Sequence, residues 1–342
     1  MSLSDYFAEF IATNEMTVWS DCDALPEVSA VEYAPGAMAL VPRAIEGSPE
    51  ATIISAGIHG DETAPIELFG ELLAALDAGQ LRVGAPTLLI MGNRRAIAAG
   101  RRYIDTNLNR LFRRETLLQD DHRFECQRAL ELMHAVDRFM SDVVKNNDAG
   151  SVLHLDMHTA IRDSRYPRFA VEPFSETPTP DAVWQQLASA GLQAGLSQHQ
   201  HSWTFSHYTR HYHGAQGFTL ELGRVAPFGS NDLEPLAPML DLLRARIAGT
   251  HDSIANQRPL VRFVVTDEIM RKSDDFELCF ADDIANFTEF PPGSCLARDG
   301  NDGEWIVREA PVHVVFPNAN VERGARALLL ARPLASEYPG TQ

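Results

Sequence analysis

The chain has 342 residues, of which 45% are apolar and 22% charged, a composition typical of a folded globular protein rather than a disordered one. Its 47 acidic residues outnumber its 29 basic ones, and the formal charge of -18 argues against partners such as nucleic acid or an anionic membrane surface. No apolar run is long enough to span a membrane, and the amino-terminal segment lacks the basic flank and apolar core of a signal peptide, so we expect a cytoplasmic protein.

The cysteines are widely spaced and form no CxxC pair. This spacing predicts reduced thiols, and neither a disulfide framework nor a zinc ribbon. The four residues concerned are Cys22, Cys126, Cys279 and Cys295.

From about residue 50 to residue 250, apolar runs that suit β-strands alternate with segments of helical periodicity. This alternation predicts an α/β fold with a largely parallel or mixed sheet. The expected strands are ATIISAG, PTLLIMGN, SVLHLDMH and GFTLELG, at 51–57, 86–93, 151–158 and 217–223. The expected helices cover 62–79 and 125–144.

The residue pattern of the sequence changes near Arg258 and Pro259. Short alternating runs follow, separated by turns such as PPG and NDG, and this pattern predicts a small β-rich domain. We therefore expect a catalytic domain at 1–257 and a β-rich C-terminal domain at 258–342.

Polar side chains stand where each of the four expected strands ends. Ligands of open α/β sheets bind outside the carboxyl ends of the strands, so these side chains predict a site at that edge. In chain order they are His59 and Glu62, Asn93, Asp156 and His158, and Glu221.

His59 and Glu62 are spaced by three residues on a turn that enters a helix, so an imidazole and a carboxylate can converge on one point. With a third ligand from a distant strand they would form a catalytic zinc site whose fourth position is open to water. We take His158 as that third ligand. The alternative for His59 is a histidine that caps the following helix.

His154 competes with His158, because both lie near one strand end, and with Asp156 they share one face of the strand. His158 is nearer the carboxyl end and is the better ligand, whereas we expect His154 to be a buried histidine with its hydrogen bonds satisfied. Asp156 could then hold a ring nitrogen of His158 and fix its tautomer.

Glu221 lies in TLELG, among apolar neighbours that would raise the pKa of its carboxyl group and suit it to act as a general base. The alternative to this catalytic role is that Glu221 forms a structural ion pair with a nearby arginine such as Arg224. The segment GNRRAIAAGRRYIDTNLNRLFRR is densely basic in an acidic chain. An arginine there could stabilise an oxyanion, and an Asn–Arg pair could bind a substrate carboxylate.

Taken together and in this order, SAGIHGDETAP, GRRYIDTNLNRLF, HLDMHTAIR and TLELG resemble the succinylglutamate desuccinylase and aspartoacylase family, which is related to zinc carboxypeptidases. HTAIR and GFTLELGRVAPFGSNDL resemble the desuccinylase branch more than the aspartoacylase branch. The resemblance implies an α/β/α sandwich with a mixed sheet, followed by the small β-rich domain.

The resemblance also implies residue roles. One Zn²⁺ per chain would bind His59, Glu62 and His158, and Glu221 would act as general acid and base. Arg102 would polarise the scissile carbonyl. The substrate carboxylates would be held by Asn109, Arg110 and, with looser local spacing, Arg210. Asp61 would be a turn residue and not a ligand.

The implied reaction is the hydrolysis of N-succinyl-L-glutamate, a small tricarboxylate, to succinate and L-glutamate. It is the last step of the arginine succinyltransferase route of arginine catabolism. Two alternatives stay open: an acylase acting on another N-acyl amino acid such as N-acetylaspartate, and a catalytically silent binding protein on the same scaffold. The sequence does not indicate an oligomeric state.

Overall fold

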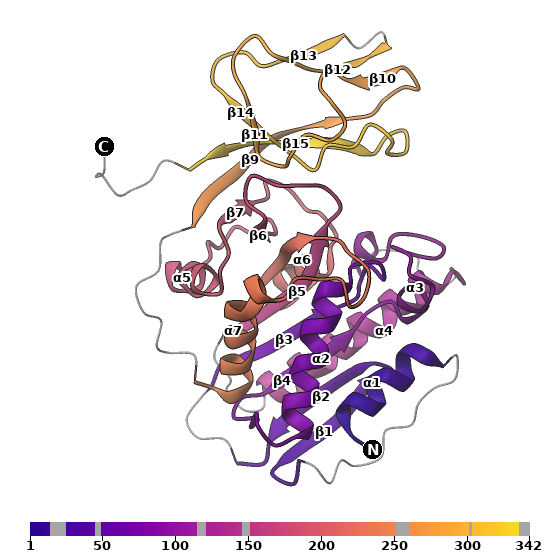
Figure 1. Cartoon of the computed structure of the whole chain (residues 1–342), viewed down its shortest axis with the longest axis vertical. Coiled ribbons are helices and arrows are strands. Elements are labelled where there is room, and N and C mark those ends of the chain that lie inside the picture. The colour runs from indigo at the N-terminus through magenta and orange to yellow at the C-terminus, as the bar shows by residue number, and fades with distance from the viewer. Residues whose placement is uncertain are drawn as a thin grey trace.

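The computed structural model describes residues 1–13, 25–44, 49–114, 121–145, 151–250, 260–300 and 303–334. A three-layer α/β body is joined to a β-rich region formed by the C-terminal part of the chain (Figure 1). The α-helices are α1 (Leu3–Ala12), α2 (Thr63–Asp77), α3 (Arg94–Ala99), α4 (Phe124–Phe139), α5 (Asp181–Ser189), α6 (Phe205–His213) and α7 (Ala237–Ala248). Shorter turns are η1 (Leu108–Arg110), the π-helical η2 (Met140–Lys145) and η3 (Glu234–Leu236).

The strands form one large mixed sheet and one small antiparallel sheet. In the body they are β1 (Val28–Ala34), β2 (Ala37–Pro42), β3 (Ala51–Ala56), β4 (Thr87–Met91), β5 (Val152–Ala160), β6 (Arg168–Glu172), β7 (Ala194–Ser197) and β8 (Gln216–Arg224). The C-terminal strands are β9 (Val261–Met270), β10 (Phe276–Leu278), β11 (Thr288–Phe290), β12 (Cys295–Asp299), β13 (Glu304–Ile306), β14 (Val312–Val315) and β15 (Arg326–Pro333).

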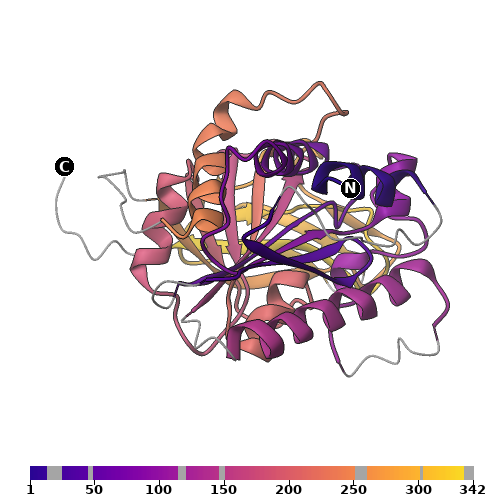
Figure 2. The same ribbon diagram turned by 90° about the horizontal axis from the view of Figure 1, so that it is seen from below.

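The predicted fold class is confirmed. The large sheet has the order β1-β2-β4-β3-β5-β8-β6-β7-β9-β15-β14-β11, with β3 parallel to both β4 and β5, and β5 parallel to β8. Helices α1, α2 and α7 cover one face, and α4 and α6 cover the other (Figure 2). Burial on both faces explains why β3 and β4 are largely apolar runs without alternation. In β5, by contrast, the buried polar residues His154, Asp156 and His158 alternate with apolar ones.

The C-terminal region is part of the same sheet, because β9 pairs in parallel with β7 and antiparallel with β15. A core cluster crosses this junction, with Phe169 and Leu196 from the body packed against Phe263 and Leu329. The predicted domain boundary between residues 257 and 258 lies outside the described residues, and that division stays a prediction.

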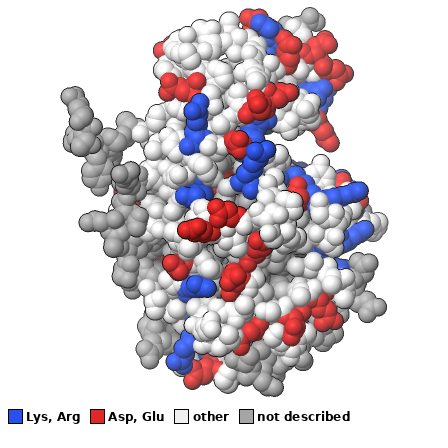
Figure 3. Space-filling model, in the orientation of Figure 1, with Lys and Arg blue, Asp and Glu red and all other residues white. Residues whose placement is uncertain are grey.

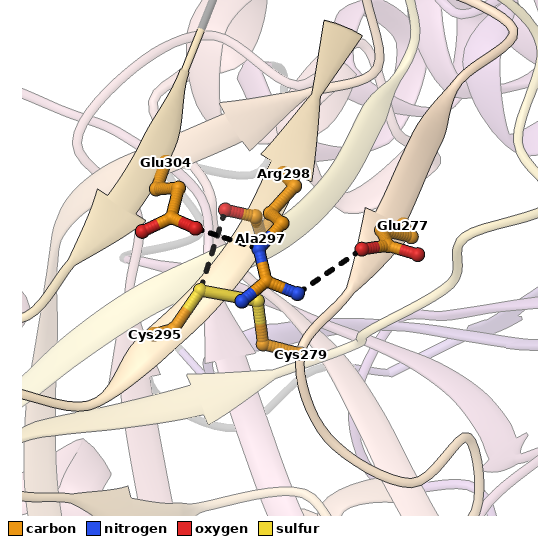
Figure 4. Close-up of a disulfide and its surroundings, with 6 residues drawn as sticks. All are labelled: Glu277, Cys279, Cys295, Ala297, Arg298 and Glu304. Atoms are coloured by element: carbon orange, nitrogen blue, oxygen red, sulfur yellow. Dashed lines mark hydrogen bonds and ion pairs between the residues drawn. A yellow bond between two sulfur atoms is a disulfide. The ribbon is translucent and has the colours of Figure 1, made fainter.

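One part of the cysteine prediction is wrong. Cys279 and Cys295 form a disulfide beside an ion-pair ladder in which Arg298 of β12 joins Glu277 of β10 to Glu304 of β13 (Figure 4). The two cysteines are separated by 16 positions and form no CxxC signal, and only the pairing of β10 with β12 brings them together. Cys126 is a free, buried thiol, as predicted, and Cys22 lies outside the described residues.

No helix in the described ranges is long and apolar enough to cross a membrane.

Asn286 fastens the C-terminal region to the loop after β5. Its backbone N–H donates to the carbonyl of Asp163 (2.8 Å), its own carbonyl accepts from the N–H of Arg165 (3.0 Å), and its buried Oδ1 accepts from the N–H of Phe316 (2.8 Å). Asn286→Ala should lower the free energy of unfolding by about 1–3 kcal/mol, because it leaves the Phe316 N–H without its acceptor. Denaturant unfolding measures this loss.

The exposed Asn318, whose Oδ1 accepts from the N–H of Asn320, supplies the matched control. Water can replace that acceptor, so Asn318→Ala should cost less than about 0.5 kcal/mol. Equal losses in the two variants would show that the buried hydrogen bond from Phe316 to Asn286 contributes no more to stability than the exposed one.

Candidate metal and catalytic centre

The three predicted metal ligands meet at the carboxyl edge of the sheet. His59 and Glu62 lie in the turn between β3 and α2, and His158 lies near the end of β5. Glu62 stands between the two rings: its Oε1 is 2.9 Å from Nδ1 of His59 and its Oε2 is 2.7 Å from Nδ1 of His158. All three side chains are buried, and one ligand atom from each lies within 4.8 Å of the others.

Glycine makes the turn between His59 and Glu62 possible. Gly60 packs directly on the backbone of α3, and a Cβ there would stand 2.1 Å from the carbonyl carbon of Ala96. Its N–H donates to the carbonyl of Arg102 (3.2 Å), which ties the ligand turn to the basic segment. The segment HGDE therefore forms a tight turn that carries both His59 and Glu62, and a larger residue at position 60 would not fit.

The outer nitrogen of each ligand ring faces an oxygen acceptor. Nε2 of His59 is 2.9 Å from Oδ1 of Asn107, and Nε2 of His158 is 3.0 Å from Oδ2 of Asp156. The hydroxyl of Ser55 donates to the other Asp156 oxygen (2.6 Å) and holds the carboxylate in place. With the protons on Nε2, both Nδ1 lone pairs point at the Glu62 carboxylate.

This donor set fits a divalent cation. Two imidazole lone pairs and a carboxylate repel one another unless positive charge lies between them. Burial opposes a positive charge on His158, yet the carboxylates of Asp156 and Glu62 outweigh it and raise the pKa of His158 well above its usual range. Burial lowers the pKa of His59 to about 4, so this ring is neutral at pH 7, as a metal ligand must be.

His154 behaves as the predicted buried histidine. Its Nδ1 is 2.9 Å from Oγ1 of Thr209 and its Nε2 is 2.9 Å from Oγ of Ser55, so both ring nitrogens have partners. It does not belong to the group of converging metal ligands.

Glu221 lies beside the triad on β8, in register with His158 of β5. Its side chain is buried, and its Oε2 has no hydrogen-bond partner among the described residues. Burial, followed by the negative charge of Glu62, raises the pKa of Glu221 to about 7. A buried carboxyl group with such a pKa can exchange a proton near neutral pH.

The basic segment borders the triad. Nη1 of Arg102 donates to Oε1 of Glu62 (2.6 Å), and Nδ2 of Asn109 is 3.3 Å from Nε2 of His158. Oδ1 of Asn109 accepts from the N–H of Phe205 (2.8 Å), and Nη1 of Arg110 donates to the carbonyl of Asn109 (2.7 Å). The structure thus places these predicted residues at the site, and their roles stay predictions.

Arg210 is engaged elsewhere. Its Nη2 is 3.2 Å from Oε1 of Glu172 and donates to the carbonyl of Thr177, while its Nη1 donates to Oγ1 of Thr179. These contacts explain the burial of Arg210 without a substrate. They connect it to the β6–α5 segment and not to the triad, so its substrate-binding role has no support in its contacts and stays a prediction.

Arg326, at the start of β15, was not among the predicted site residues. Burial, followed by the nearby positive charges of Arg326 and Arg102, lowers the pKa of Arg110 to about 10. Arg326, from the C-terminal region, therefore lies near enough to Arg110 for their charges to interact. In the view of Figure 3, basic side chains gather at the waist between this region and the body. No local pattern in RALLLARP marks Arg326, since only the sheet brings β15 to the site.

Glu125, another residue that was not predicted as part of the site, holds the basic segment in place through hydrogen bonds. Its buried carboxylate accepts hydrogen bonds from Nδ2 of Asn93 and from the backbone N–H groups of Ile104, Asp105 and Thr106, at 2.7–3.3 Å. It lies in the first turn of α4, where acidic residues are common, so the sequence offered no distinctive signal.

Glu125→Gln turns one of these acceptors into a donor that faces other donors, so the loop carrying Asn109 and Arg110 should loosen. For the hydrolysis that the resemblance implies, we expect kcat/KM to fall about tenfold or more, which corresponds to about 1.4 kcal/mol per factor of ten. The metal content should not change. Steady-state kinetics and metal analysis check this. Loss of the metal in the variant would contradict a role confined to the loop.

Comparisons with known proteins identify the family of the chain. Residues 49–247 match the family model described as succinylglutamate desuccinylase/aspartoacylase catalytic domain. Residues 258–334 match the one described as AstE/AspA barrel-sandwich hybrid domain.

Curated relatives are similar over most of the chain. The succinylglutamate desuccinylase of Ectopseudomonas mendocina is 39% identical over 302 residues, which cover 87% of this chain and 88% of the relative. That of Erwinia tasmaniensis is 40% identical over 296 residues, covering 86% and 87%. A solved succinylglutamate desuccinylase from Vibrio parahaemolyticus superposes with a TM-score of 0.86 at 31% identity, covering 96% of this chain and 95% of the other.

Proposed function

The chain belongs to the succinylglutamate desuccinylase/aspartoacylase family, and on that premise we propose that it hydrolyses N-succinyl-L-glutamate to succinate and L-glutamate. The similarity to relatives that bear the desuccinylase name, over most of both chains, supports this substrate. The convergence of His59, Glu62 and His158 beside Glu221 is the single observation of the structure that carries the proposal.

The triad would hold one Zn²⁺ through Nδ1 of His59, Nδ1 of His158 and the carboxylate of Glu62. When bound, the ion would polarise the amide carbonyl and lower the pKa of a bound water. Asn107 and Asp156 would keep the two rings in the tautomer that this binding requires.

Glu221 would handle the proton. Its carboxylate takes a proton from the water that attacks the succinyl amide carbonyl, and it returns this proton to the departing amine of glutamate. The attack forms the new C–O bond to the succinyl carbonyl carbon. The C–N amide bond then breaks, which releases succinate and the amine of glutamate. A pKa of about 7 suits both the uptake and the delivery of this proton.

Arg102 would stabilise the oxyanion that develops on the attacked carbonyl. A guanidinium has five N–H groups, and the contact with Glu62 uses one of Arg102's. The same contact holds the guanidinium beside the triad, which reduces the reorganisation needed during the reaction.

The three carboxylates of the substrate would be bound by hydrogen-bond donors, two of them cationic, from two parts of the chain. Asn109 and Arg110 come from the basic segment and Arg326 comes from β15. The mutual repulsion of Arg102, Arg110 and Arg326 would be relieved when an anionic substrate binds among them.

Arg326→Gln should therefore raise KM for succinylglutamate about tenfold or more, with a smaller effect on kcat, because a charged contact to the bound substrate is lost. Steady-state kinetics separate the two constants. Arg323→Gln, at an exposed arginine just before the same strand, is the matched control and should leave KM unchanged. An unchanged KM in the Arg326 variant would exclude this contact.

The reaction itself is tested by supplying succinylglutamate to the purified protein and quantifying free glutamate and succinate, with and without chelator. Equimolar products that disappear with chelator are expected. Faster turnover of N-acetylaspartate would instead assign the acylase alternative, and turnover of neither compound would leave the binding-protein alternative.

We also propose that this activity serves as the last step of the arginine succinyltransferase route and that the protein acts in the cytoplasm. The names of the relatives support the first point. Disulfides are rare in the cytosol, so the second point predicts that the bond between Cys279 and Cys295 is reduced in the cell. Mass spectrometry of alkylated protein from freshly lysed cells tests the state of these thiols.

A further inference from the structure

Three histidines gather on α6 and the loop before it, and none of them belongs to the triad. His207 and His211 are four residues apart, so their rings lie on one face of the helix, stacked with centroids 5.2 Å apart and 14° between their planes. The ring of His201, from the loop after β7, lies 5.0 Å from the first and 4.9 Å from the second. One ring nitrogen from each residue lies within 4.8 Å of the others.

The hydrogen bonding of this cluster is incomplete. Nδ1 of His201 and Nε2 of His207 are 2.8 Å apart, and the fully buried His207 has no partner for its Nδ1 among the described residues. Across the described ranges of the chain, no carboxylate forms an ion pair with any of the three rings. Ordinary salt bridges therefore do not account for their convergence.

The cluster is open to solvent on one side. His201 and His211 are exposed, and both line a cavity of about 500 Å³ together with Glu176, Arg210 and Gln216. An ion could enter from this cavity, and a water molecule could stay bound to it there. The third ring, that of His207, is buried beneath the exposed pair.

We propose that His201, His207 and His211 form a second metal site, separate from the triad, which takes a divalent ion that prefers imidazole nitrogen. Three imidazoles and one water complete the tetrahedral coordination of Zn²⁺, and Cu²⁺ and Ni²⁺ accept the same ligands. The His-x3-His spacing on α6 supplies two ligands and the preceding loop supplies the third, so the ion fixes the loop to the helix.

This loop supports the basic segment. The carbonyl of Trp203 accepts from the N–H of Phe112 (3.3 Å), and the N–H of Phe205 donates to Oδ1 of Asn109 (2.8 Å). The ring of Trp203 stacks on His201, with centroids 5.4 Å apart, and its backbone φ is 53°. An ion at the second site would hold this unfavourable conformation in place.

Counting bound ions tests the proposal. The full chain, prepared without a polyhistidine tag, is stripped with chelator and titrated with Zn²⁺ by calorimetry. The wild type should bind two equivalents and the double variant His201→Gln/His211→Gln one. Both substituted positions are exposed, so this variant should fold. His134→Gln, at an exposed histidine on α4, is the matched control and should bind two.

The outcomes separate this proposal from the proposed function, on which it does not rest. One equivalent in the wild type, unchanged in the double variant and lost in His158→Ala, would overturn the second site alone. One equivalent that disappears in the double variant would support the second site and contradict the zinc triad. Two equivalents in the double variant would also overturn the second site.

A spectroscopic measurement checks the ligands. In the His158→Ala background, Cu²⁺ added to one equivalent should give an electron paramagnetic resonance spectrum with nitrogen hyperfine coupling. Adding His201→Gln and His211→Gln should remove this nitrogen coupling and leave the spectrum of copper with oxygen ligands. Nitrogen coupling that persists unchanged in this triple variant would assign the copper to other groups and overturn the proposed ligands.

Discussion

Replacing Glu221 by glutamine is expected to lower kcat for succinylglutamate about a thousandfold, within the range that general acid–base catalysis contributes. The amide has nearly the shape of the carboxyl group, so the buried site should stay folded. The glutamine amide, however, cannot take a proton from the attacking water or return one to the leaving amine. Zinc content should stay at the wild-type value, because Glu221 is not among the converging ligands.

The pH profile gives the second readout for Glu221. A general base must be ionised, so kcat/KM should fall as the pH drops below the pKa of this group. Burial and the charge of Glu62 raise that pKa to about 7, and a cation at the triad would lower it, so the acid limb should lie at or below pH 7. The limb should be lost in Glu221→Gln. Near-normal turnover, or the same acid limb in the pH profile of the variant, would contradict the assignment of Glu221 as the general base.

Replacing His158 by alanine is expected to remove the metal from the triad and to lower turnover at least about a thousandfold, since activation of water and polarisation of the carbonyl are lost together. The change also leaves Asp156 and Glu62 buried without the ring that both contact. Metal analysis by mass spectrometry and a fixed-time assay of glutamate release measure the two effects.

Chelated wild-type protein serves as the comparison. It should lose activity to the same extent and regain it on addition of Zn²⁺, whereas His158→Ala should not. His134→Gln, which changes an exposed histidine on α4, should match the wild type throughout. Full activity in metal-free wild-type protein would contradict the metal mechanism, whatever the variant does.

The sequence anticipated the central strands β3, β4, β5 and β8 well. Strands β3 and β4 are largely apolar runs, as buried parallel strands are, whereas β5 and β8 alternate apolar and polar residues. It also predicted α2 and α4, whose apolar residues recur at helical spacing. Helix α6 was missed because histidine and tyrosine, which carry no clear apolar signal, make up much of FSHYTRHYH. The short strands β6 and β7 depend on their neighbours more than on their own patterns.

Within the site, the local residues were easier to predict than their partners. The three-residue spacing of His59 and Glu62 is fixed by one turn of backbone, so it could be read directly. Glu125 and Arg326 act across 19 or more positions of sequence, and each has an ordinary local context. Contacts of that kind depend on strand order and on helix packing.

By itself the sequence determined which chemical groups the chain carries and which of them share a turn or a strand face, because backbone geometry fixes separations over a few residues. It therefore supplied the HxxE turn and the choice between His154 and His158 on one strand. Only the tertiary structure decided what meets across the sheet. Strand β5 brings His158 to Glu62, β8 brings Glu221 beside it, β15 brings Arg326 to Arg110, and α6 gathers a histidine cluster that no motif announced.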